Sequence, residues 1–84
     1  MELEEQLMMF DRYCDLACER VLQFMVEERY RILLLARRRL REGHKQYGDS
    51  SWARSQQELT DELLAELADA CNYMVMKLSG ADCS

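Results

Sequence analysis

The stretch LEEQLMMFDRYCDLACERVLQF, residues 3–24, decides the fold class because its apolar side chains recur at alternating steps of four and three residues. The positions of this N-terminal stripe are Leu3, Leu7, Phe10, Cys14, Ala17, Val21 and Phe24. Such steps place side chains along one face of an α-helix, whereas a half-buried strand requires strict alternation. The pattern therefore predicts a long amphipathic helix that packs one face against another helix.

The chain after this stripe continues as a helical pattern in a shifted phase. Three charged residues, 27–29, interrupt the stripe, and no glycine or proline occurs before Gly43. We therefore predict a helical segment over residues 3–42. As one helix it would be about 57 Å long, and a bend within residues 26–30 would divide it into two helices. The sequence leaves both possibilities open.

A loop is predicted over residues 43–56. Gly43 follows an arginine-rich turn, which is typical of a helix C-terminus, and residues 47–50 (YGDS) carry a turn signal. We expect the loop aromatics, Tyr47 and Trp52, to pin this loop to the helices.

The second predicted helix covers residues 57–79. Ser55 and Glu58 have the S-x-x-E spacing of a capping box, and Ser79-Gly80 is the expected end. The apolar stripe of this helix comprises Leu59, Leu63, Leu67, Ala70, Met74 and Leu78. One face of this helix is thus available for packing against residues 3–42.

The composition supports a single all-α domain over residues 1–84. The chain is 49% hydrophobic, with three glycines and no proline, and sandwiches or barrels use these turn residues heavily. A chain of 84 residues has a marginal core of its own. We therefore expect a helical bundle completed by self-association, most simply as a homodimer.

The sequence also favours a cytoplasmic protein. The longest uncharged apolar run, residues 32–36, is far shorter than a membrane span, and the N-terminal MELEE is acidic where a signal peptide is basic. Reduced thiols are then expected at the four cysteines, which we interpret as small buried side chains rather than zinc ligands. These are Cys14, Cys18, Cys71 and Cys83.

Charge is distributed unevenly along the chain. Residues 29–45 hold seven basic residues and one acid, whereas the rest of the chain holds 15 acids and four bases. Arginine matches the geometry of phosphate and carboxylate oxygens, so this basic segment is a candidate for binding phosphate or an acidic partner. The net charge of −5 disfavours general nucleic-acid binding. The candidate binding residues are Arg37, Arg38, Arg41 and Lys45.

Four acids of the second predicted helix share one helical face. Glu58, Glu62, Glu66 and Asp69 are spaced by four, four and three residues, so neighbouring carboxylates repel one another. A hard cation such as Mg²⁺ would offset this repulsion, and so would the arginines of residues 29–45 folded back against the helix. The second interpretation makes the stripe part of a charge-complementary hairpin. A solvated face without a special role is a third possibility.

Residues 66–78, ELADACNYMVMKL, resemble the second metal motif of the all-α nucleoside triphosphate pyrophosphohydrolases, the MazG-like superfamily. That motif is E-x-x-D, often with a tyrosine four residues after the aspartate, and it is matched by Glu66, Asp69 and Tyr73. The preceding GHKQYGDSSW is similar to a loop of small phage and bacterial proteins that place a YGD turn before such a helix.

The resemblance implies a Mg²⁺ site and a nucleotide ligand. Its metal ligands would be Glu28, Glu62, Glu66 and Asp69, with Arg37, Arg38 or Lys45 at the phosphates. In the family, water attack releases pyrophosphate and a nucleoside monophosphate. Arg31 stands where the first family motif, E-E-x-x-E, carries its third glutamate.

Because that motif is incomplete, our first expectation is a small non-enzymatic interaction protein on a degenerate MazG-like scaffold. It would be encoded by a phage or mobile element, and it would bind and modulate a protein partner. The alternative is a Mg²⁺-dependent pyrophosphohydrolase of MazG-like type.

Overall fold

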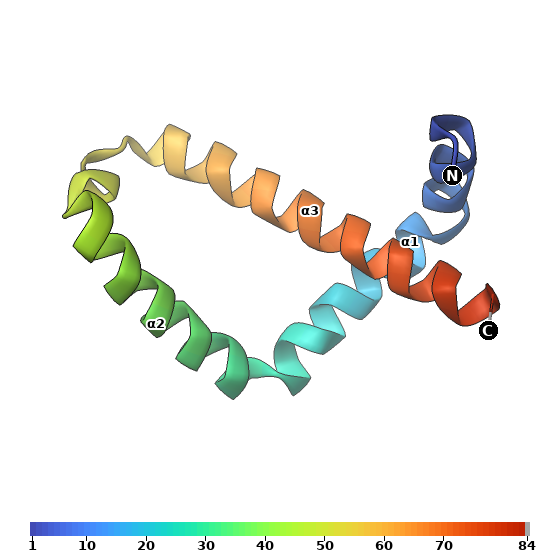
Figure 1. The fold of residues 1–84 in the computed structure, drawn as a ribbon, viewed down its shortest axis with the longest axis horizontal. Coiled ribbons are helices and arrows are strands. Elements are labelled where there is room, and N and C mark those ends of the chain that lie inside the picture. Colours follow the sequence, from blue (N-terminus) through green and yellow to red (C-terminus); the bar gives the residue numbers. More distant parts are fainter. Residues whose placement is uncertain (84) are drawn as a thin grey trace.

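The computed structural model describes the backbone of residues 1–83 and the side-chain surroundings of residues 1–80. The chain forms α1 (Leu3–Glu27), α2 (Arg29–Tyr47), a short 3₁₀ helix η1 (Ser50–Ala53) and α3 (Gln56–Cys83) (Figure 1). No strand occurs within residues 1–83, so the predicted all-α fold is confirmed.

Glu28 separates α1 from α2 and settles the question that the sequence left open. Its backbone has φ −103° and ψ 19°, outside helical geometry. Its N–H donates to the carbonyl of Phe24 at 2.8 Å, and its own carbonyl accepts from the N–H of Ile32 at 2.9 Å. Hydrogen bonding therefore continues on both sides while the chain changes direction at the charged interruption of the apolar stripe.

The predicted helix end at Gly43 is wrong. Helix α2 continues through Gly43 to Tyr47, and Gly48 ends it with φ 65° and ψ −133°. The N–H of Gly48 donates to the carbonyl of His44 at 2.8 Å. Glycine within a helix costs only about 1 kcal/mol relative to alanine, whereas the positive φ at position 48 strongly favours glycine. Only part of residues 43–56 is therefore loop.

The predicted start of α3 is confirmed by its cap. The N–H of Glu58 donates to the Ser55 hydroxyl at 3.1 Å, as the capping-box spacing predicts. The predicted end at Ser79-Gly80 is wrong, since α3 continues to Cys83. The Ser79 hydroxyl donates to the carbonyl of Met76 at 3.1 Å, a bond that forms within a continuing helix.

The crossing of α1 and α3 holds the main packing contact of the chain (Figure 1). Ala17 of α1 is fully buried and Val75 of α3 is 6% exposed, and these are the only buried side chains among residues 1–80. Alanine at the crossing lets the two helices approach closely. The Lys77 ammonium lies 5.6 Å from the centre of the Phe24 ring and adds a cation–π contact between the same helices.

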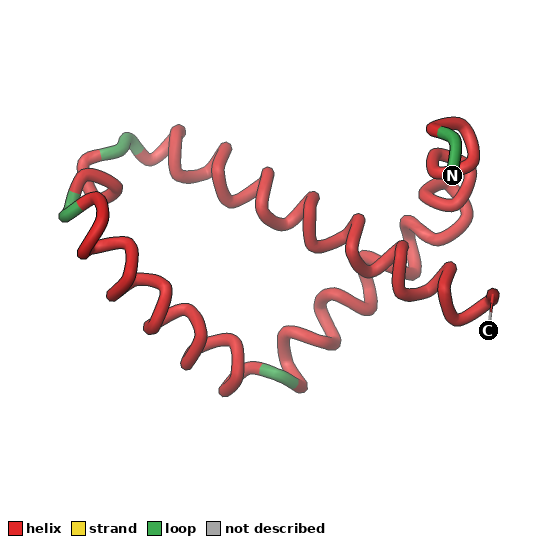
Figure 2. The backbone as a smooth tube through the Cα atoms, viewed as in Figure 1, coloured by secondary structure: helices red, strands yellow, loops and turns green. Residues whose placement is uncertain are grey.

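Helices α2 and α3 meet at the corner formed by η1 and run apart from there toward α1 (Figure 2). The radius of gyration is 15.9 Å, against about 12 Å for a compact domain of this length. The accessible surface is 7678 Å², against about 5,200 Å² for a compact monomer of this mass. The single chain is therefore an open arrangement of helices.

None of the helices described over residues 1–83 is both long enough and apolar enough to cross a membrane.

Candidate functional site

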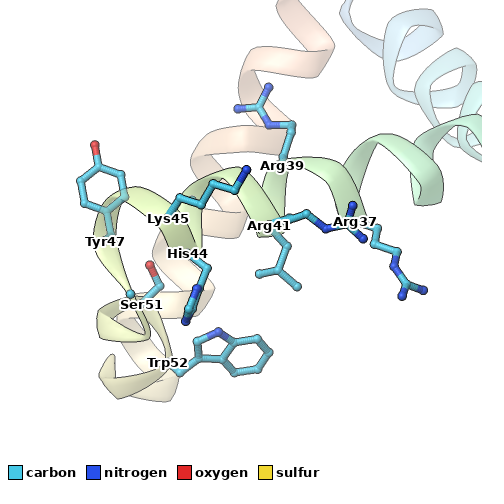
Figure 3. A pocket seen from close by; sticks show the side chains of 11 residues that line it. Arg37, Arg39, Arg41, His44, Lys45, Tyr47, Ser51 and Trp52 are labelled. Atoms are coloured by element: carbon cyan, nitrogen blue, oxygen red, sulfur yellow. The ribbon is translucent and has the colours of Figure 1, made fainter.

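A pocket of about 650 Å³ lies at the corner between α2 and η1 (Figure 3). It is formed by the last three turns of α2, by the turn at Gly48 and by η1. The lining residues are Arg37, Arg39, Leu40, Arg41, Gly43, His44, Lys45, Tyr47, Gly48, Ser51 and Trp52. Cationic and aromatic side chains therefore converge there, and no acidic residue of the described chain lines the pocket.

The turn after α2 determines the shape of this pocket. The positive φ of Gly48 reverses the chain, and the N–H of Trp52 then donates to the carbonyl of Asp49 at 2.9 Å to form η1. The Ser50 hydroxyl donates to the carbonyl of Tyr47 at 3.1 Å and ties η1 to the helix end. As a result, the indole of Trp52 lies opposite the imidazole of His44 (Figure 3).

The structure brings together three of the four predicted phosphate-or-partner-binding residues. Arg37, Arg41 and Lys45 recur every four residues along α2, and all three line the corner pocket. Arg38 points elsewhere and lines a second groove, of about 450 Å³, at the bend between α1 and α2. That groove also includes Phe24 and Glu28.

Arg39, which belongs to the basic segment considered for binding phosphate or an acidic partner, also lines the pocket. His44 and Trp52 line it as well, and neither was among the predicted binding residues. The prediction that Tyr47 and Trp52 pin the loop to the helices is wrong, since these side chains are 63% and 75% exposed. The sequence could not show that these two aromatic side chains are exposed beside the basic residues of α2, because that placement depends on how the chain turns at Gly48.

The predicted metal ligands are not gathered within one chain. Glu62, Glu66 and Asp69 lie on exposed positions of α3, whereas Glu28 is at the α1–α2 junction. Over the described residues, no group of three or more His, Cys, Asp or Glu side chains is arranged to hold a metal ion. Magnesium binding stays a prediction.

The predicted pairing of the acidic stripe with the arginine cluster is also not formed within one chain. The ion pair recorded for the described residues joins Arg31 Nη1 to Glu28 Oε2 at 3.2 Å, one turn apart at the start of α2. Helices α2 and α3 diverge from the corner at η1 (Figure 1), and the described acids and bases of these two helices are exposed. Both charged surfaces are available to a partner.

The cysteines are only partly as predicted. Cys14 and Cys71 are half-buried beside the α1–α3 crossing, whereas Cys18 is exposed; all three are free thiols. The side chain of Cys83 lies outside the residues whose surroundings are described. The two half-buried thiols lie one helical turn from Ala17 and from Val75, which agrees with a packing role.

The chain matches no known family model, no curated protein and no solved structure. The MazG-like likeness therefore stays a prediction from the sequence of residues 43–52 and 66–78.

Proposed function

We propose that this chain is a small non-enzymatic helical interaction protein whose fold is completed by a protein partner that it binds and modulates. One observation carries the proposal: 23 large hydrophobic side chains are exposed, whereas only Ala17 and Val75 are buried among residues 1–80. Monomeric proteins rarely expose contiguous apolar patches of more than a few hundred Å². The degenerate MazG-like scaffold, with its phage or mobile-element origin, belongs to this proposal.

The excess surface that the single chain exposes is large enough to form an interface with a partner. The chain exposes about 2,400 Å² more than a compact monomer of its mass, whereas a standard interface buries about 800 Å² on each partner. Apolar side chains contribute much of the excess, and their burial contributes about 25 cal/mol per Å². A partner that covers these faces would therefore supply most of the stability that the single chain lacks.

Thermal unfolding followed by helical circular dichroism tests this proposal at rising chain concentrations. If the chain self-associates, we expect a melting temperature that rises with concentration. If the partner is another protein, we expect the chain alone to be weakly helical. A cooperative transition that is independent of concentration would show a chain complete on its own. That result overturns the proposal.

The alternative function is Mg²⁺-dependent hydrolysis of a nucleoside triphosphate to pyrophosphate and a monophosphate. In its favour, Glu62, Glu66 and Asp69 share an exposed face of α3, and the corner pocket offers Arg37 and Trp52 to a phosphate and a base. Within one chain these two sets lie on diverging helices, so an assembly would have to unite them.

Pyrophosphate release from a panel of nucleoside triphosphates with Mg²⁺ separates the two functions. The interaction protein releases none, and Mg²⁺ leaves its melting temperature unchanged. Release that is lost in Glu66→Ala and in Asp69→Ala, but retained in Gln57→Ala as a control on another face of α3, would establish the enzyme instead.

A further inference from the structure

We infer that the partner that covers α2 is α3 of a second copy of this chain, and that the contact occurs twice in a two-fold dimer. This inference rests on the proposed function and names the partner. It follows from the apolar faces and from the charges of the two diverging helices.

The docking face of α2 combines an exposed apolar row with a basic edge. Leu33, Leu40 and Tyr47 recur every seven residues and are 59%, 56% and 63% exposed. The basic edge consists of Arg37, Arg41 and Lys45, which continue from Leu33 at steps of four residues and are exposed as well. No residue of α2 is buried within the described chain.

The docking face of α3 has the same construction with the opposite charge. Its N-terminal half exposes an apolar row at steps of four: Leu59, Leu63 and Leu67. Each residue of the acidic edge directly precedes one member of this row, and the edge comprises Glu58, Glu62 and Glu66. The acidic edge of α3 therefore runs beside its apolar row, as charged positions flank the seam of a coiled coil, and the basic edge of α2 begins beside Leu33.

The net charges of the helices select which faces pair. Helix α2 carries seven basic residues and one acid, whereas α3 carries six acids and one base. Packing α2 on α2, or α3 on α3, would juxtapose like charges, which costs several kcal/mol at an interface. Packing α2 on α3 joins opposite charges, and the divergence of these helices within one chain leaves the pairing to a second chain (Figure 2).

Two-fold symmetry makes the arrangement self-limiting. The α2 of each copy receives the α3 of the other, so both acidic and both basic edges are satisfied in a closed dimer. Helix α2 is about 28 Å long and α3 about 42 Å. The N-terminal half of α3, about 21 Å long, can thus cover most of α2 while its C-terminal half keeps the crossing with α1 at Val75.

Charge reversal on one helix at a time tests the pairing. The α2-reversed chain carries Arg37→Glu, Arg41→Glu and Lys45→Glu, and the α3-reversed chain carries Glu58→Lys, Glu62→Lys and Glu66→Lys. Sedimentation equilibrium of the wild type should give a mass twice that of the 10.0 kDa chain. Each reversed chain alone should dimerise at least about a hundredfold more weakly, because both of its interfaces join like charges.

An equimolar mixture of the two reversed chains is the decisive measurement. In the mixture, each α2 again meets an α3 of opposite charge, so a heterodimer should form with close to wild-type affinity. Pairing of α2 with α3 within one chain would give no such rescue on mixing. A control chain with Glu4→Lys, Glu5→Lys and Glu19→Lys has the same charge change as the α3-reversed chain but should dimerise like the wild type.

Three results would overturn the inference. They are unchanged dimerisation of both reversed chains, absence of rescue in the mixture, and a wild type that stays monomeric. A weakly helical monomer would show that the occupant is another protein and would leave the proposed function intact. A tightly folded monomer would contradict both proposals.

Discussion

The α1–α3 crossing and the α2–η1 corner are stabilised by different interactions. At the crossing, the fully buried Ala17 faces α3, and half-buried residues surround it. At the corner, no side chain of α2 or η1 is buried, and the geometry is set by Gly48 and by local hydrogen bonds. The first region depends on tertiary contact, and the second depends on backbone chemistry.

This difference has a functional consequence. The crossing uses its apolar surface within the chain, so it is a structural element. The corner keeps its cationic and aromatic side chains exposed, so it is free to bind. Substitutions at the crossing should therefore cause a larger loss in the free energy of unfolding than substitutions at the corner, which should mainly disturb local structure.

The largest effect is expected for Ala17→Lys at the crossing. It places an unpaired ammonium where no solvent reaches, and we expect a loss of about 3 kcal/mol or more in the free energy of unfolding. Urea unfolding at one fixed chain concentration measures it. Ala65→Lys, at an exposed position of α3, is the matched control and should lose nothing. Equal stability of the two variants would show that the crossing is not the core.

Gly48→Ala should have the next largest effect, and it acts on the corner. The φ of 65° with ψ −133° is strained for any residue with a Cβ, so we expect a loss of about 1–3 kcal/mol. The same urea titration measures this loss, and Trp52 fluorescence reports the disturbance of η1. An unchanged transition with unchanged emission would contradict the assigned turn.

Ser55→Ala removes the cap of α3 and tests a purely local contribution. Loss of the hydroxyl that accepts from the Glu58 N–H should cost about 1 kcal/mol. Thermal unfolding gives the comparison with Ser51→Ala, an exposed serine of η1 that caps no α-helix. If both alanine variants melt together, the cap contributes nothing.

Gly43→Ala should have the smallest effect, and it should be stabilising. A Cβ at this position meets no atom within 4 Å, and the backbone is helical. We therefore expect a gain of about 0.5–1 kcal/mol, through higher helix propensity and a less flexible unfolded chain. A loss on urea unfolding would restore Gly43 as a helix end.

Much of the fold could be predicted from residue spacing. The stripe from Leu3 to Phe24 gave α1, and Ser55 with Glu58 gave the start of α3, because both signals are local. The helix ends were less predictable. Gly43 and Gly80 carry the residue type of a helix end, but neighbouring turns continue the hydrogen bonding through them.

The candidate site was predictable only in part. The four-residue spacing of Arg37, Arg41 and Lys45 places them on one face of any helix, and the structure unites them. The contribution of His44 and Trp52 depends on the reversal at Gly48, which no helical periodicity contains. The grouping of Glu28 with the acids of α3 required a long-range contact that the single chain does not make.

The sequence by itself determined that this protein is all-α, with a basic segment and an acidic helix, because periodicity, capping and charge act over a few residues. Only the tertiary structure decided that the chain bends at Glu28, that α3 crosses α1 at Ala17, and that α2 and α3 run apart. These features depend on which apolar faces meet, and the free energy of that choice comes from surfaces distant in sequence. Because the fold is open, the basic residues of α2 and the acidic residues of α3 stay exposed and can bind a partner.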